Sequence, residues 1–132
     1  APILYVTGVK WLVERPRPIT SVGSDLLPGD PSFPSGHTAA AVIVSVMMIL
    51  TVRNFARKRF PDGEDDGRAN GRRVFLRRAV IGAVALVVAV ACSRLLLGLH
   101  YPTDVIISAT ICPLISHAVW CVWNAYESAA ER

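Results

Sequence analysis

The sequence predicts an all-α protein, a transmembrane helical bundle with about four helices, from three observations. Hydrophobic residues make up 52% of the 132 residues and charged residues only 18%. The mean hydropathy of +0.42 is too high for an ordinary soluble domain. The apolar residues are gathered into four segments, and nine of the fourteen basic residues lie between two of these, from Arg53 to Arg78. A chain of this length forms one domain, so residues 1–132 are treated as a single domain.

The four apolar segments differ in length. The first, residues 1–13, is short and is expected to be the tail of a helix. The others lie at residues 38–52 (with a start as early as Ser35), 74–99 and 105–123. The last of these approaches the roughly 20 residues that cross a bilayer, whereas the other two reach that length only with their polar ends. Because the chain begins with Ala1 and shows no signal peptide, we expect a fragment or a processed product.

The loop from Arg53 to Arg78 is expected to be a solvated linker on the cytoplasmic side of the membrane, because loops rich in lysine and arginine are retained in the cytoplasm. A nucleic-acid patch is the competing interpretation, but four interleaved acids and the flanking apolar spans argue against it. One span on each side of this loop carries the chain across the membrane. The Pro-rich loop before His37 and the turn before Asp104 therefore share the non-cytoplasmic face.

Cysteine usage gives little sign of a disulfide or a metal. Cys92, Cys112 and Cys121 all lie in apolar stretches, in an odd number and without CxxC spacing. We expect them to be small buried apolar residues.

The polar residues of that shared face form a set suited to phosphate. Arginines bind phosphate oxygens bidentately and a lysine adds a point charge. The N–H groups at a helix start form an anion site, and glycine allows close approach. A histidine can attack phosphorus while a carboxylate orients its other nitrogen, and a second histidine can protonate the leaving oxygen. The residues are Lys10, Arg17, Ser35, Gly36, His37, Arg94, His100 and Asp104.

Their spacing resembles the signature of the type 2 phosphatidic acid phosphatase (PAP2) family, written K-x6-R-P, P-S-G-H and S-R-x5-H-x3-D. All three blocks are present in order and without a departure, beginning at Lys10, Pro34 and Ser93. Arg15 offers a second Arg-Pro pair, but only Arg17 has the family spacing from Lys10. Members of this family usually have six membrane helices, so the resemblance implies a chain that holds the C-terminal part of such a domain and lacks its first two helices.

The resemblance implies a metal-independent phosphatase of the plasma (inner) membrane that needs no cofactor. His100 would be the nucleophile oriented by Asp104, and His37 would be the general acid. Phosphate would be held by Lys10, Arg17, Ser35, Gly36 and Arg94. Candidate substrates are phosphatidate, phosphatidylglycerophosphate and polyprenyl phosphates or diphosphates, and a bacterial enzyme that recycles a polyprenyl carrier fits the outward site. Glu14, Asp25 and Asp30 are interpreted as solvated loop residues that could set access for an anionic substrate.

Two other functions remain open at this stage. Vanadate-dependent haloperoxidases share the phosphate pocket, but they are soluble, and the apolar spans argue against them. A catalytically inactive lipid-binding or transport subunit is the second alternative. Such a subunit would normally have lost a catalytic residue, whereas His37, His100 and Asp104 are all present.

Overall fold

The computed structural model describes residues 2–18, 29–59 and 66–130, and these ranges form four helices. Helix α1 spans Pro2–Val13, α2 spans Gly36–Arg59, α3 spans Asp66–Leu96 and α4 spans Pro102–Ala130. No strand occurs in the three described ranges. The predicted all-α fold with about four helices is confirmed.

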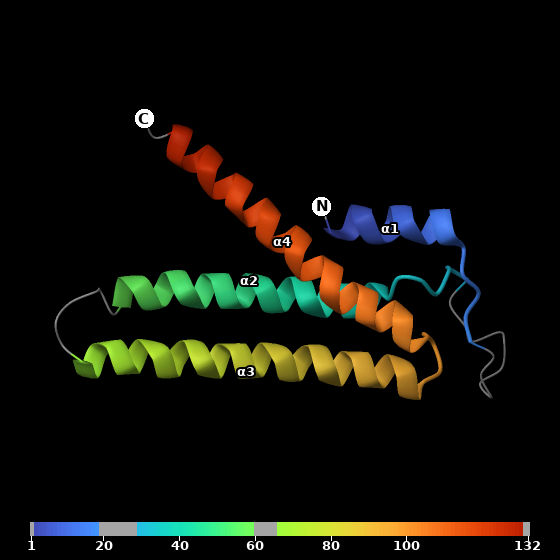
Figure 1. The fold of residues 1–132 in the computed structure, drawn as a ribbon, viewed down its shortest axis with the longest axis horizontal. Coiled ribbons are helices and arrows are strands. Elements are labelled where there is room, and N and C mark those ends of the chain that lie inside the picture. The colour runs from blue at the N-terminus through green and yellow to red at the C-terminus, as the bar shows by residue number, and fades with distance from the viewer. Residues whose placement is uncertain (1, 19–28, 60–65, 131–132) are drawn as a thin grey trace.

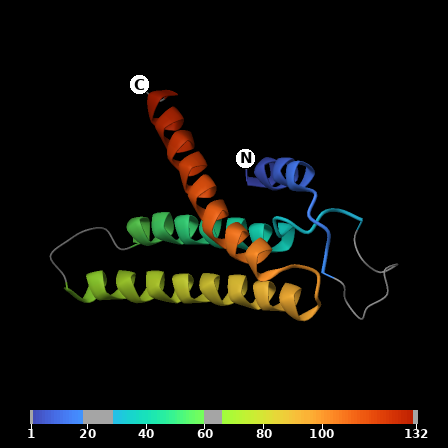
Figure 2. The ribbon, with the colours of Figure 1, turned by 45° about the vertical axis from the view of Figure 1, so that its right-hand side comes forward.

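The helices form an open arrangement around a long antiparallel pair. Helices α2 and α3 lie side by side, and α4 crosses α2 near its start before diverging from the pair toward its own C-terminus (Figure 1, Figure 2). A buried cluster marks the place where α1, α2 and α4 meet. Its members are Val6, Ala39, Val42 and Cys112.

Small residues allow the close approach of α2 and α3. Ala83 is 2% exposed, and its carbonyl accepts a hydrogen bond of 3.3 Å from the Ser45 hydroxyl. Short side chains at a helix interface bring the backbones together, and polar groups such as this hydroxyl add hydrogen bonds across it. The pairing therefore depends on small side chains as well as on apolar surface.

Three helices are long and apolar enough to cross a membrane: Gly36–Arg59, Asn70–Leu96 and Pro102–Ala130. Much of their apolar surface is exposed, and only 6% of the most apolar window of α3 is buried. Ile81, Val84 and Val88 on that helix are each more than half exposed. Apolar surface of this extent suits contact with lipid or with further helices.

Most described side chains between Arg53 and Arg78 are exposed, as expected of a solvated segment, but the prediction that this segment is a linker is wrong for most of its length. Helix α2 continues to Arg59 and α3 begins at Asp66, and of this stretch residues 60–65 lie outside the described ranges. Arginine, lysine, alanine and leucine are good helix formers, and basic residues in the last turn of α2 complement its dipole. The rings of Phe55 and Phe75 pack with their centroids 6.2 Å apart and join the two polar extensions.

The expectation for the cysteines holds at one position. Cys112 is fully buried in the core cluster, whereas Cys92 and Cys121 are exposed. Position in an apolar stretch does not show which face of a helix a residue occupies when several faces are apolar.

Candidate active site

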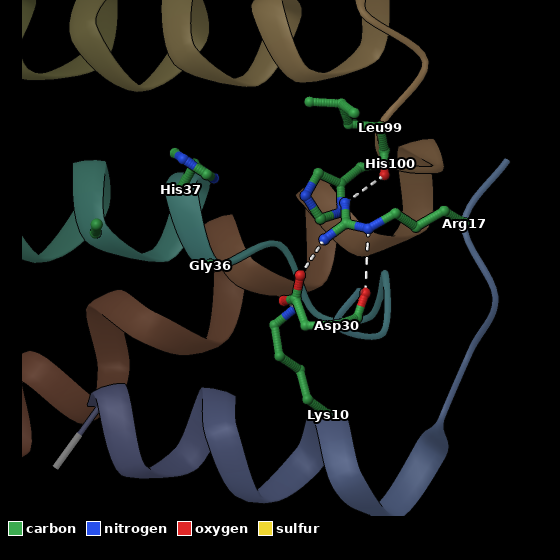
Figure 3. A pocket seen from close by; sticks show the side chains of 8 residues that line it. Lys10, Arg17, Asp30, Gly36, His37, Leu99 and His100 are labelled. Carbon is green, nitrogen blue, oxygen red and sulfur yellow. Dashed lines mark hydrogen bonds and ion pairs between the residues drawn. The ribbon is translucent and has the colours of Figure 1, made fainter. Parts of the chain in front are cut away.

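A cavity of about 350 Å³ opens at the end of the bundle where α2 begins and α3 ends (Figure 3). Three stretches far apart in sequence supply its walls: the end of α1 with the segment after it, the loop into α2, and the turn between α3 and α4. The lining residues are Lys10, Arg17, Asp30, Gly36, His37, Ala40, Leu99 and His100.

Two cations of the first stretch face the cavity. Lys10 lies in the last turn of α1, and Arg17 lies three residues after Glu14, where the chain leaves α1 with a positive φ of 46°. The guanidinium of Arg17 donates a hydrogen bond of 2.9 Å from Nη1 to the Leu99 carbonyl. The side chains of Lys10 and Arg17 are only 12% and 9% exposed, so water screens their charges weakly.

Both cations hold the carboxylate of Asp30. Lys10 Nζ lies 2.6 Å from Oδ2, and Arg17 Nη2 lies 2.6 Å from Oδ1. Burial alone would raise the pKa of Asp30, but hydrogen bonds and charge from Lys10 and Arg17 outweigh it and lower the pKa to about 2. Asp30 lies in a loop with its side chain 48% exposed, as expected, but it is also paired with both cations, which sequence spacing does not show. Asp25 lies outside the described residues.

A helix-ending turn places His100. Gly98 has a φ of 64°, its N–H donates to the Leu95 carbonyl at 2.9 Å, and the Leu99 N–H donates to the Arg94 carbonyl at 3.1 Å. This is a Schellman motif, in which glycine takes the left-handed conformation that other residues adopt at a cost. Helix α4 then begins at Pro102, whose fixed φ suits a first helical position. His100 is thus held in a short connection between two rigid helices.

The ring of His100 is oriented by a backbone carbonyl. Nδ1 lies 2.7 Å from the Ser32 carbonyl oxygen and 3.5 Å from Asp104 Oδ2. Because a carbonyl oxygen only accepts, Nδ1 carries the hydrogen in this bond, and Nε2 of the neutral ring keeps its lone pair. Burial lowers the pKa of His100 below its ordinary value, Arg17 and Lys10 lower it further, and Ser32 and Asp104 oppose this in part. The neutral, nucleophilic form is therefore favoured near pH 7.

Ser32 connects the three stretches. Its N–H donates to the Arg15 carbonyl at 2.8 Å, and its hydroxyl donates to the Pro16 carbonyl at 3.1 Å. Its own carbonyl accepts from His100. Ser32 could not be identified from the sequence, because it orients His100 through its backbone carbonyl, a group that every residue has.

Asp104 is fully buried behind His100 and is held chiefly by another partner. Arg15 Nη1 lies 2.9 Å from Oδ1, and the N–H of Tyr101 donates to Oδ2 at 2.9 Å. The second bond is half of a capping box at the start of α4. Arg15 also donates to the Thr103 hydroxyl at 2.6 Å, and its guanidinium stacks 4.0 Å from the centroid of the Tyr101 ring. Arg15, which belongs to an Arg-Pro pair but lacks the family spacing from Lys10, is therefore the main charge partner of Asp104.

The start of α2 supplies the remaining wall. Ser35 is the N-cap, with its hydroxyl oxygen 3.4 Å from the Thr38 N–H and 3.0 Å from the Thr38 hydroxyl. Gly36 and His37 follow as the first two helical residues, so their N–H groups have no carbonyl partner within the helix. His37 is exposed at the cavity, where Figure 3 shows both histidine rings among the lining residues.

The structure brings some predicted site residues together and separates others. Lys10, Arg17, Gly36, His37 and His100 share the cavity. Ser35 and Asp104 are both fully buried, Ser35 as a helix cap and Asp104 beside His100 and Arg15. Arg94 is not among the lining residues, and its guanidinium donates to the Ser93 hydroxyl at 2.9 and 3.1 Å. Within the described ranges, no three histidine, cysteine, aspartate or glutamate side chains are grouped as a metal site.

Comparisons with known proteins find relatives of this chain by sequence. Two proteins of Mycobacterium tuberculosis, from strains CDC 1551 / Oshkosh and ATCC 25618 / H37Rv, are each 29% identical to this chain over 127 residues, and both are called decaprenylphosphoryl-5-phosphoribose phosphatase. The alignment covers 94% of this chain and 56% of each relative, so the chain spans about half the length of the curated relatives it matches. No solved structure gives a significant match.

A family model matches nearly the full length of the chain. The model of the PAP2 superfamily matches residues 1–127, a range that includes all three motifs and every residue of the cavity wall. The resemblance that the motif spacing indicated is therefore confirmed, and the chain belongs to the PAP2 superfamily.

Proposed function

We propose that this chain carries the catalytic part of an integral membrane phosphatase that hydrolyses a lipid phosphate through a phosphohistidine. The observation that carries the proposal is the ring of His100, whose Nδ1 is bound to the Ser32 carbonyl while the ring lines a cavity with Lys10 and Arg17. A neutral imidazole with a free Nε2 beside two cations suits attack on a phosphate whose oxygens those cations hold.

The reaction has two steps. In the first, His100 Nε2 forms a bond to phosphorus, the bond from phosphorus to the lipid oxygen breaks, and protonated His37 gives its proton to that oxygen. In the second, neutral His37 accepts a proton from water as the water oxygen attacks phosphorus. The phosphorus–nitrogen bond breaks, inorganic phosphate leaves, and His37 is protonated again. Lys10, Arg17 and the N–H groups of Gly36 and His37 would hold the oxygens of the transferring group.

A lipid ester is the favoured substrate class, and a polyprenyl phosphate or diphosphate is the preferred member. The cavity lies at the end of three apolar helices with exposed apolar faces, so the tail of a lipid can remain in the bilayer while its phosphate enters. The names of the two mycobacterial relatives indicate a polyprenyl-linked phosphate as their substrate. Phosphatidate and phosphatidylglycerophosphate are the alternatives within the same chemistry.

We expect hydrolysis without a metal. The cavity presents two cations, and its carboxylate is already neutralised by them, so a divalent cation would be repelled. Phosphate release should be measured from a polyprenyl phosphate, a polyprenyl diphosphate and phosphatidate by the detergent-solubilised protein, with and without excess EDTA. The expected result is release from at least one lipid at an undiminished rate in EDTA. Loss of activity in EDTA and its recovery with magnesium would contradict the mechanism.

We place the active site on the non-cytoplasmic face of the plasma (inner) membrane. The cavity and the basic extensions of α2 and α3 lie at opposite ends of the helical pair, and basic segments are retained on the cytoplasmic side (Figure 1). A multi-pass protein with this orientation would act on lipids of the outer leaflet.

Cysteine labelling in intact cells tests this orientation. Gly29→Cys and Lys58→Cys, both at exposed positions, are introduced separately after the three native cysteines are replaced. An impermeant maleimide should label Gly29→Cys in intact cells and Lys58→Cys only after permeabilisation. The reverse pattern would place the chemistry in the cytoplasm.

A further inference from the structure

Arg15 and Arg17 stand two residues apart and serve different parts of the site. Arg17 lines the cavity with His100, whereas Arg15 is not among the lining residues. Instead, Nη1 of Arg15 donates to Asp104 Oδ1 at 2.9 Å and to the Thr103 hydroxyl at 2.6 Å, at the start of α4. Arg15 therefore acts on the site through Asp104 and not by holding phosphate.

Both oxygens of the Asp104 carboxylate are occupied by donors other than His100. Oδ1 accepts from Arg15, and Oδ2 accepts from the N–H of Tyr101 at 2.9 Å. His100 Nδ1 lies 3.5 Å from Oδ2 and donates instead to the Ser32 carbonyl at 2.7 Å. The ring and the carboxylate are therefore neighbours that are not hydrogen-bonded to each other.

This separation suits a nucleophile that becomes cationic as it reacts. When Nε2 of His100 bonds to phosphorus, its lone pair forms the new bond, and the ring takes up a positive charge while Nδ1 keeps its hydrogen. The side chain of Asp104 is fully buried, so water screens its attraction for that charge weakly. A hydrogen bond between carboxylate and ring in the resting state would favour the imidazolium too early, and an imidazolium has no lone pair with which to attack.

We propose that Arg15 is a positioning residue, which keeps the Asp104 carboxylate near His100 without a hydrogen bond between them and so keeps the ring neutral until it attacks phosphorus. This inference rests on the proposed function and adds to it a residue outside the cavity. Without Arg15, Oδ1 would be a buried acceptor with no partner, and buried acceptors are nearly always hydrogen-bonded. The N–H of His100 is a donor within reach, so the carboxylate would turn to the ring and stabilise its cationic form.

Several groups other than Arg15 set the pKa of His100. Burial lowers the pKa, nearby cations lower it further, and the Ser32 carbonyl and the charge of Asp104 raise it. The charged or titratable groups around the ring are Lys10 and Arg17 from the first stretch, Asp30 before α2, His37 on α2 and Asp104 on α4, whereas Arg94 at the end of α3 turns to Ser93. Replacement of Arg15 leaves all of these in the chain. The loss of its own positive charge would also raise the pKa of His100, so a test must separate that effect from a movement of Asp104.

A titration of His100 by NMR separates the two effects without turnover. The full chain, isotopically labelled in its histidine rings and solubilised in detergent, carries His37→Ala and His117→Ala in every sample, so that His100 is the only histidine that remains. Arg15→Met removes the charge and the hydrogen bonds, and Arg15→Lys keeps a charge that can still pair with Asp104. Asp104→Asn is titrated alone and together with Arg15→Met.

Arg15→Met should raise the midpoint of the His100 titration by about one pH unit, a gain in proton affinity of roughly tenfold, and Arg15→Lys should not. In the Asp104→Asn background, Arg15→Met should have little effect, because no carboxylate is left to turn to the ring. An unchanged midpoint in Arg15→Met would overturn the proposal, and so would an equal rise in both backgrounds, since Arg15 would then act by its charge alone. If Arg15→Met does not fold, the two Asp104→Asn samples still decide: equal midpoints support the proposal, and a rise of about one pH unit between them overturns it.

The pH dependence of kcat/KM for a lipid phosphate, in the chain that keeps His37 and His117, is the second readout. Arg15→Met should lose rate chiefly on the acid side and regain most of it about one pH unit higher, whereas a purely structural defect would lower the rate at every pH and overturn the proposal. A wild type that releases phosphate from a lipid while an overturning result holds loses only this inference. A wild type that releases no phosphate from any lipid loses the proposed function, whatever the titration of His100 shows.

Discussion

Replacement of His100 by alanine should reduce phosphate release by at least about 10³-fold and abolish the covalent phosphoenzyme with every substrate. The ring supplies the attacking Nε2, and no other described histidine lines the cavity apart from His37, which lies at the start of a different helix. The measurement is acid-quenched trapping with a lipid phosphate labelled in its phosphate group, followed by detection of an acid-labile, base-stable adduct on the protein.

The matched control for this variant is His117→Ala. His117 lies on α4 outside the lining of the cavity, with its nearest polar contact 3.7 Å away at Cys121 Sγ. It should form the phosphoenzyme at the wild-type rate. A phosphoenzyme of wild-type yield in His100→Ala would show that another residue is the nucleophile.

Replacement of His37 by alanine should produce the second large loss, and its size should depend on the leaving group. A general acid contributes about 10²–10⁴-fold when the departing oxygen is a poor leaving group such as an alkoxide. An aryl phosphate such as p-nitrophenyl phosphate needs little protonation, so His37→Ala should recover part of its rate with that substrate. Rates of phosphoenzyme formation with a lipid phosphate and with the aryl phosphate, measured in the same variant, give the comparison.

The same pair of substrates separates the roles of the two histidines. His100→Ala should remain inactive with the aryl phosphate, because an activated leaving group does not replace a missing nucleophile. If the aryl phosphate restored activity to His100→Ala and not to His37→Ala, the two histidines would have the opposite roles. The rate of Asp104→Asn should lie between those of His100→Ala and His37→Ala, because Ser32 still orients the ring of His100 through Nδ1.

The large-scale arrangement could be predicted from the sequence because hydrophobicity determines it. Four apolar segments gave four helices, and the alternation of spans placed the three motif blocks at one end of the bundle. The ends of the helices were less predictable. The polar stretch after Val52 has good helix formers and pairs through Phe55 and Phe75, so the helices continue beyond their apolar parts.

The partners of the site residues could not be predicted in the same way. Motif spacing identified Lys10 and Arg17, but the acid that joins them comes from another loop, and only the folded chain brings it there. Asp104 was expected to face His100, yet Arg15 is its closer partner because both of its oxygens must be satisfied in a fully buried place. Ser35 and Arg94 belong to the motifs by spacing, whereas their side chains bond to near neighbours in the sequence.

The paired extensions of α2 and α3 have a practical consequence for imaging. Helix α3 has 31 residues and is about 46 Å long, which exceeds the roughly 30 Å of a bilayer core, so part of the hairpin would project from a membrane or a detergent micelle in the proposed arrangement. A protein of 14.3 kDa is far too small for its particle images to be aligned by the helices alone. A soluble helical module inserted between Arg59 and Asp66, continuous with both helices, would give each particle a rigid landmark outside the micelle. Because the hairpin lies at the far end from the cavity, such a fusion would leave the chemistry untouched.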